Sequence, residues 1–582
     1  MTGDWPTSIG HMTVRWVGDA DEAHLPATHL RLERLIGEVD LRPPGMLPGE
    51  VLIIAHLRGL PPLTDMVRLS RVWVDGIRMQ LADLYHRARH PARGTVPPDT
   101  VSVLFADEAE LLLCLTRDGL AARAGEHWYW RRVLAPGALR TPGETLSAAW
   151  AAYAGALPAV VARLAPDEIR RIAWTLRPAG IAQVVRALHA QFRLPDEVLA
   201  VLAEHTTAPP EEMPAIAEAP WTRWCPPGWD YIPPQVELLL GLAAALYHAP
   251  AYARTLDFAR QTVAWFQAAQ RMAPDLTGPA PHPAPAARAT EPAVLAPKAA
   301  GIDPVGNEQS LSAPADVRTE PRLQLELGGF ETRLGGVLYL INLLAWLDLP
   351  QGWPGDFASH VSGWGLVEAL ARGLLAEQHA SYAADPLWPA LAELDRRAPG
   401  DPIAPDWLVR DAFRLPVTWL ARFGAAAQAW TMVQGGERLA LIDTVGGYLV
   451  ADVPLAGRDP DEAVTAELEP YHAAGLAVTW TWGAVWPDHT LSPDVSTALG
   501  PGLGRWLADT VGFVHDLLAR ALGPDLTPAQ MLCEPGQVMV SQTHVDLFLS
   551  LEQIQLPVRR IGLDQDPGWV PDLGFIVLFH YG

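Results

Sequence analysis

The chain has 582 residues, and 66 acidic residues against 43 basic ones give it a formal charge of −23 at pH 7. Only one basic residue, Lys298, is a lysine, and it lies in a Pro/Ala-rich stretch. This position excludes P-loop chemistry and argues against Schiff-base or Ser-x-x-Lys sites, which need an ordered lysine. The acidic charge argues against nucleic acid as a partner, because binding to phosphates needs a dense basic footprint.

Cysteine content and hydropathy indicate the compartment. The chain has three cysteines, Cys114, Cys225 and Cys533, too few and too scattered for a disulfide framework or a zinc site. The first residues lack the basic start and apolar core of a signal peptide. The longest strongly apolar segment, residues 335–347, is shorter than the roughly 20 residues that a membrane span needs. We therefore expect a cytoplasmic protein with no membrane span.

The first part of the chain alternates between strand and helix patterns. Apolar and β-branched runs predict strands at residues 12–17, 50–56 and 102–105. Helical spacing of apolar residues predicts a helix at residues 68–89, and another helix should begin near Asp107. We predict a mixed α+β domain over residues 1–134.

Residues 135–272 should be mainly helical. Residues 165–168 and 194–197 both place proline and acids where the first turn of a helix favours them. A Pro/Trp-rich connector covers residues 206–234, and its tryptophans should pin it onto the domain. Residues 235–272 have a long helical pattern.

Residues 273–321 contain ten prolines, and their apolar residues are mostly alanine. Such a segment cannot bury enough surface to offset its ordering entropy, so it should be a disordered or extended linker. The parts on either side differ in charge. Residues 1–205 carry 23 acidic and 22 basic residues, whereas residues 322–582 carry 31 and 14.

The acidic C-terminal domain, residues 322–582, should be α+β, with helices packed on an antiparallel sheet. Apolar spacing predicts helices at residues 331–347, 362–377, 418–433 and 503–521. Strand patterns occur at residues 437–445, 448–453, 476–485, 545–550, 553–559 and 575–581. Gly446 and Gly447 should close a tight hairpin, and residues 476–485 should have one aromatic face. The predicted fold class is α+β, with two folded halves joined by the Pro/Ala-rich linker.

Two loops have ligand-like patterns that are incomplete. Residues 500–504 are rich in glycine but lack the third glycine of a dinucleotide loop, which favours a helix start. Residues 564–568 begin like a calcium loop, but Gly568, Trp569 and Phe575 occupy positions that need oxygen ligands or glycine. These residues should form a turn capped by side chains.

The candidate nucleophiles also lack suitable partners. Ser541, His544 and Asp546 lie on one predicted strand, where residues three and five positions apart point in mixed directions. Ser362 lacks the glycine two positions earlier that a nucleophile elbow needs. We predict no catalytic residue, cofactor or metal ligand. The alternative is a hydrolase-like enzyme whose site is assembled from distant residues, such as His544 and Asp546 with partners elsewhere.

The most distinctive string runs from Arg559 through Asp564, Asp566 and Trp569 to Tyr581. This ending resembles uncharacterised proteins encoded in gene clusters of extracellular contractile injection systems, which are phage-tail-like particles. Residues 31–41 and 335–340 look similar to parts of that system's tape-measure-associated family. The chain departs from a tape measure because it has no long uninterrupted helical rod. The resemblance therefore implies an accessory or assembly role.

The leading hypothesis is a non-enzymatic structural or assembly factor of such a particle, with other protein subunits as partners. Two halves of unlike charge on a linker can engage two partners at once. An exposed tryptophan beside two arginines would be a candidate interaction site, because tryptophan and arginine often dominate binding at interfaces. The interaction candidates are Arg559, Arg560, Asp564, Asp566 and Trp569.

Overall fold

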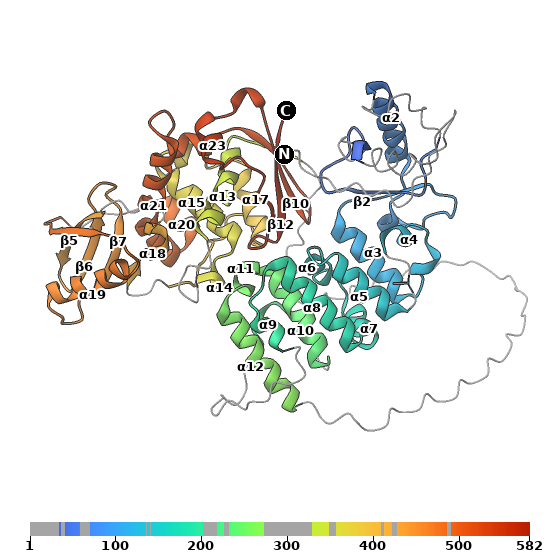
Figure 1. Ribbon diagram of the computed structural model, residues 1–582, viewed down its shortest axis with the longest axis horizontal. Coiled ribbons are helices and arrows are strands. Elements are labelled where there is room, and N and C mark those ends of the chain that lie inside the picture. The colour runs from blue at the N-terminus through green and yellow to red at the C-terminus, as the bar shows by residue number, and fades with distance from the viewer. Residues whose placement is uncertain are drawn as a thin grey trace, which may run out of the picture.

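The computed structural model describes residues 34–36, 41–58, 70–134, 137–139, 141–201, 218–225, 232–272, 329–348, 357–408, 412–421, 428–485 and 491–582. The fold is α+β, as the sequence predicts, with three sheets among these residues. In Figure 1, the strands β5, β6 and β7 with α19 lie at one end of the molecule, far from α2.

A two-stranded sheet and the helices α2 and α3 form the N-terminal part. β1 (Val51–Ile54) pairs antiparallel with β2 (Ser102–Phe105). Ser70 caps α2 (Arg71–Arg87), and Asp107 caps α3 (Glu108–Leu120) by accepting a hydrogen bond from Glu110 N. These elements confirm the predicted strands at 50–56 and 102–105 and both predicted helices. The predicted strand at residues 12–17 lies outside the described residues.

The described residues of the predicted helical region, 135–272, are mainly helical, and a further short helix begins at Trp130. Proline occupies the first turn of most of these helices, where its missing N–H costs nothing. The helices are α4 (Trp130–Val133), α5 (Pro142–Ala152), α6 (Leu157–Val161), α7 (Pro166–Thr175), α8 (Pro178–Phe192), α9 (Glu197–Ala200), α10 (Pro234–His248), α11 (Pro250–Ala253) and α12 (Leu256–Met272).

Trp221 fixes the connector to this helical region. Its ring is fully buried and packs edge-on against Trp265 at 4.8 Å. On α10, Gly241 leaves the necessary space, because a Cβ there would lie 2.2 Å from the Trp221 ring. The prediction that tryptophan pins the connector is confirmed for Trp221.

The C-terminal half contains two five-stranded sheets rather than the single predicted sheet. The first has the order β11-β12-β10-β9-β3 and is antiparallel except for the parallel pair β10 and β12. Its strands are β3 (Phe330–Thr332), β9 (Gly536–Val540), β10 (His544–Leu549), β11 (Gly568–Val570) and β12 (Phe575–Tyr581).

The second sheet, which we call the distal sheet, has the order β4-β7-β6-β5-β8. It also has one parallel pair, β5 with β8. Its strands are β4 (Phe413–Arg414), β5 (Gln428–Gly435), β6 (Arg438–Asp443), β7 (Leu449–Pro454) and β8 (Val478–Trp482). The predicted hairpin joins β6 and β7, but its turn is wider than two residues because Asp443 Oδ1 accepts hydrogen bonds from Val445 N and Gly446 N.

Helices fill the space around the two sheets in one continuous core. Gly335–Tyr339 forms a 3₁₀ turn, and a Cβ on Gly336 would lie 2.0 Å from Met531 O, so this close approach requires glycine. The helices are α13 (Leu340–Leu347), α14 (Phe357–His360), α15 (Gly363–Leu374), α16 (His379–Tyr382), α17 (Leu387–Leu394), α18 (Val417–Ala421), α19 (Pro460–Ala473), α20 (Pro493–Leu499), α21 (Pro501–Leu522), α22 (Pro528–Leu532) and α23 (Leu556–Ile561). No helix in the described ranges is both long and apolar enough to span a membrane.

Two predicted elements have the wrong type. The predicted helix at 418–433 begins within α18, but residues 428–433 belong to β5, where Trp430 and Met432 alternate with Thr431 across the sheet. The predicted strand at 553–559 instead contains the start of α23. Pro557 occupies the first turn of this helix, and Gly562 ends it with a φ of 77°.

Glu534 is a buried acid in this core. It is 2% exposed, and one carboxylate oxygen accepts a hydrogen bond from Tyr339 Oη at 3.0 Å. The other oxygen, Oε1, has no hydrogen-bond partner. Burial raises the pKa of Glu534 to about 7.

We expect Glu534→Gln to stabilise the protein above pH 7. The folded state holds the Glu534 proton more tightly than the unfolded chain does, so wild-type stability falls as pH rises from about 4.5 to about 7. The amide removes this loss, which is at most about 3 kcal/mol, and its oxygen still accepts from Tyr339. Urea unfolding at pH 5 and pH 8 measures the difference. Glu552→Gln, at an exposed site, should leave the pH profile unchanged, and an identical profile in Glu534→Gln would contradict the prediction.

Candidate functional site

The C-terminal segment, residues 551–582, carries all five interaction candidates. Arg559 on α23 donates from Nε to Asp564 Oδ2 at 2.7 Å, and its guanidinium lies 4.9 Å from the ring centre of Tyr581. Tyr581 Oη in turn donates to Asp564 O at 3.1 Å. Arg559 and Asp564 therefore tie the end of α23 to β12.

Asp566 also ties the segment before β11 to β12. Its Oδ1 accepts a hydrogen bond from Phe579 N at 2.7 Å. Asp564 lies in a turn and Gln565 in a bend before β11, so a turn occurs where it was predicted. The two aspartates accept from Arg559 and from Phe579, which lie outside the turn. The Asp566 carboxylate is held within the chain by a backbone donor.

Trp569 on β11 contacts the helical region of the N-terminal half. Its Nε1 donates to Gln191 O at 2.8 Å, and its ring packs edge-on against Phe192 at 5.1 Å. Gly155 lies against the same ring, at a distance where a Cβ would make an ordinary van der Waals contact of 3.4 Å. Trp569 thus joins the two halves, and it is only partly exposed.

Further contacts extend this junction between the halves. Arg254 forms an ion pair with Asp572, and both side chains are largely buried. Arg223 Nη2 donates to Ser359 O at 2.9 Å, and Gln542 N donates to Asp107 Oδ2 at 3.1 Å. Figure 1 shows α14 beside α11, which contact each other. The two folded halves are therefore in contact with each other, and the predicted linker, residues 273–321, lies outside the described residues.

A hollow of about 360 Å³ lies at the junction. Its lining combines Glu108, Tyr153 and Gln191 from one half with Thr543 and Trp569 from the other. Burial, followed by the charge of Asp107, raises the pKa of the Glu108 carboxyl above its ordinary value. His544 and Asp546, the residues of the enzyme alternative, do not line this hollow.

His544 and Asp546 point to different partners. Asp546 Oδ1 lies 2.6 Å from Nε2 of His580 on β12, whereas His544 Nδ1 lies 2.8 Å from Thr543 Oγ1. Ser541 Oγ accepts a hydrogen bond from His544 N at 3.0 Å, which stabilises the turn between β9 and β10. Burial lowers the pKa of His544. In these contacts the three residues bond to different partners and not in the Ser–His–Asp order of a triad.

The remaining motifs have structural roles. Ser362 caps α15, accepting from Gly365 N and donating to the buried Asp395. Gly500 precedes α21 with a φ of 85°, and a Cβ on Gly502 would lie 1.9 Å from Trp407 O. The first turn of α21 thus packs against the backbone of Trp407. Residues 500–504 form the start of a helix, as predicted. Within the described ranges, no three His, Cys, Asp or Glu side chains are placed to share a metal ion.

One part of the C-terminal segment faces solvent, and we call it the α23 surface. It consists of Leu551, Leu556 and Arg560. Leu551 is 57% exposed and Leu556 is 71% exposed. Leu556 and Arg560 are one helical turn apart, so they share a face of α23. The sequence pattern predicts Arg560 but not Leu556, because residues 553–559 resemble a strand, and no motif marks Leu551.

Comparisons of the chain with protein-family models, with curated proteins and with solved structures find no match. The candidate site consequently rests on the geometry of the C-terminal segment alone. Four of the five candidates form hydrogen bonds to other residues of the protein, and Arg560 lies on the exposed face of α23.

We expect Trp569→Ala to uncouple the two halves. The change removes the ring from Phe192 and the hydrogen bond to Gln191, at a cost of about 2 to 4 kcal/mol. Hydrogen exchange should speed up in both α8 and β11, and thermal unfolding should separate into two transitions. Trp174→Ala is the matched control, because Trp174 is 87% exposed on α7. Unchanged exchange in α8 would show that the ring does not hold the halves together.

Proposed function

We propose that the protein is a non-enzymatic structural or assembly factor of a contractile injection particle and acts in the cytoplasm through contacts with other protein subunits. One observation carries the proposal. The segment that resembles proteins of these gene clusters also joins the two halves and presents the α23 surface.

The α23 surface has the composition of a small binding site. Two exposed leucines leave apolar area in water, and covering them in a partner would recover roughly 25 cal/mol for each Å² buried. Arg560, one helical turn from Leu556, adds a guanidinium group with several N–H donors. Arginine is enriched among the residues that dominate binding at interfaces. Such a surface favours a protein partner over a small molecule.

The junction supports this role because it holds the α23 surface against the rest of the molecule. α23 is tied to β12 through Arg559 and Asp564, and β11 is tied to α8 through Trp569. A partner therefore meets a preorganised surface and loses little free energy in ordering it. This is a useful property in a factor that positions subunits.

The proposal predicts a loss of particles when the α23 surface is altered. Deleting the gene in the native host should reduce the number of assembled particles seen by electron microscopy, and the wild-type gene should restore it. A gene with both Leu556→Asp and Arg560→Glu should restore few particles. The two new carboxylates would be buried against the partner without a positive charge to pair with.

Leu408→Asp is the matched control, since this leucine is 75% exposed at another site. It should restore particles as well as the wild type does. Normal particle number and length in the deletion strain would contradict the proposed function. Circular dichroism of the purified variants checks that each is folded.

A further inference from the structure

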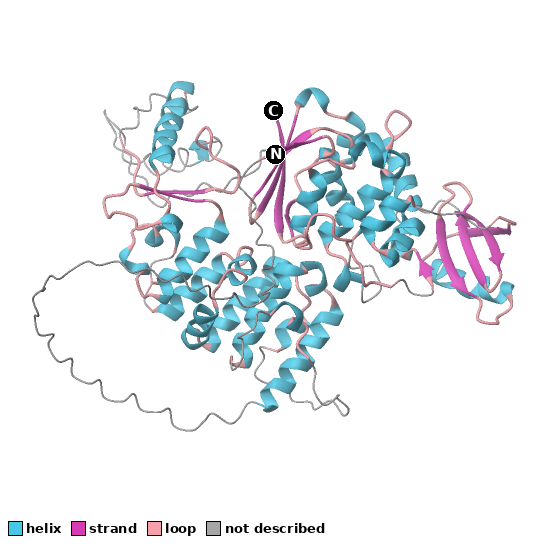
Figure 2. Cartoon of the chain, turned by 180° about the vertical axis from the view of Figure 1, so that it is seen from behind, coloured by secondary structure: helices cyan, strands magenta, loops and turns pink. Residues whose placement is uncertain are grey.

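The distal sheet ends in an aromatic edge strand, β8. It is the last strand in the sheet order and pairs only with β5 among the described residues, with Trp480 in register with Trp430. Figure 2 shows the sheet at one end of the molecule, projecting beyond the helices. This position leaves the strand accessible from outside.

The hydrogen bonds of β8 show which backbone groups face outward. Gly483 N donates to Met432 O, and Ala477 O accepts from Gln428 N, both at 2.8 Å. In a parallel pair, alternate residues direct N–H and C=O to the same neighbour. Val478, Trp480 and Trp482 therefore direct these groups to the outer edge. No strand in the described part of the chain pairs with them.

The side chains of β8 add exposed aromatic area along this edge. Trp480 is 36% exposed and Trp482 is 45% exposed, and their rings meet edge-to-face at 5.7 Å. Trp430, the neighbour of Trp480 on β5, is buried against Tyr471 of α19 at 4.9 Å. The two exposed rings thus continue the core face of the sheet to its edge, where an added strand could cover them.

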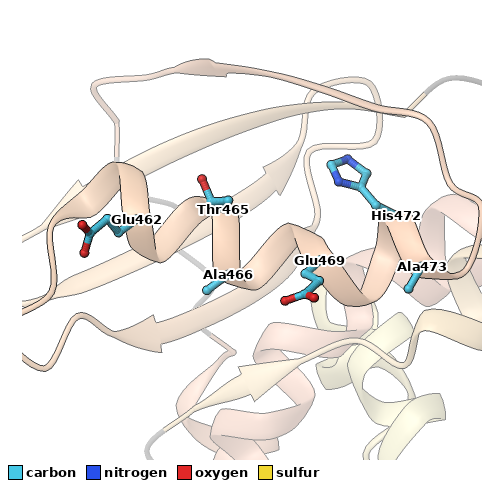
Figure 3. A pocket seen from close by; sticks show the side chains of 6 residues that line it. All are labelled: Glu462, Thr465, Ala466, Glu469, His472 and Ala473. Atoms are coloured by element: carbon cyan, nitrogen blue, oxygen red, sulfur yellow. The ribbon is translucent and has the colours of Figure 1, made fainter.

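The charge around the edge indicates the chemistry of the partner. Residues 428–485 contain eight carboxylates and two arginines. Three of the carboxylates, on Asp443, Asp452 and Glu467, are buried, and Arg414 of β4 pairs with Glu467. Arg438 pairs with Asp452 at 2.8 Å, and Arg458 donates to Leu455 O. On the outer side of α19, Glu462, Glu469 and His472 line an open hollow of about 740 Å³ (Figure 3). The other five carboxylates of residues 428–485 are exposed, and this surface charge favours a basic segment as the partner.

We propose that β8 accepts an extended basic segment of another protein as a sixth strand of the distal sheet. Backbone bonds at Val478, Trp480 and Trp482 supply the pairing, and the two tryptophans cover alternate side chains of the added strand. A second copy of this chain fits poorly, because its acidic unit would meet the same charge. The proposal goes beyond the particle role and does not depend on it.

Binding of short synthetic strands to the full chain tests this proposal. The probes are a fluorescein-labelled peptide of alternating lysine and valine, the same peptide with glutamate for lysine, and a backbone N-methylated form of the first. Fluorescence anisotropy should show saturable binding of the lysine peptide. The glutamate and N-methylated peptides should bind at least about tenfold more weakly, since the former carries the wrong charge and the latter lacks N–H donors.

Variants of β8 assign the binding to this edge. Trp480→Ala with Trp482→Ala should weaken the lysine peptide about tenfold. Trp482→Pro should weaken it further than Trp482→Ala, because proline removes an outward N–H and leaves the bonds to β5 intact. Trp174→Ala, at an exposed tryptophan on α7, should bind as the wild type does. Circular dichroism identifies any variant that fails to fold.

Three outcomes would overturn the proposal. Equal binding of the glutamate or N-methylated peptide would exclude strand addition by a basic segment. Undiminished binding in the double alanine variant would place the peptide elsewhere. Sedimentation showing self-association that Trp482→Pro abolishes would assign the edge to a second copy of the chain.

Discussion

The packing of Trp569 against α8 is the contact on which the arrangement of the molecule depends. It is reinforced by Arg254 and Asp572, a pair whose charges have lost most of their water. Breaking such a pair by removing one partner costs more than the pair itself contributes, because the other charge stays buried. The junction therefore resists partial loosening, and both halves share a common stability.

Local signals predicted much of the fold. Helix starts at Pro166 and Asp107 were identified because proline and capping acids act within one turn. The errors at 418–433 and 553–559 occurred where short apolar runs fit either type of element, and only tertiary pairing decided between them. The number of sheets and their parallel pairs depend on contacts between distant residues, which no local pattern encodes.

The candidate site was predicted in part. The C-terminal segment was identified as distinctive, and its turn at 564–568 was predicted from Asp and Gly preferences. The contact of Trp569 with α8 could not be predicted, because Gln191 and Phe192 are hundreds of residues away in the sequence. The aromatic alternation of 476–485 was visible, but its place at a sheet edge follows only from the strand order.

The order of strands in the first C-terminal sheet has a consequence for synthesis. Of the strands in this sheet, β12 comes last in the sequence, yet it lies inside the sheet, between β10 and β11. A nascent chain that stops before Phe575 leaves β10 with an open edge and β11 with no strand to hold it. The protein thus cannot bring Trp569 to α8 in its native setting until residues 575–581 leave the ribosome. Docking of the halves through Trp569 therefore depends on a strand that follows it in the sequence.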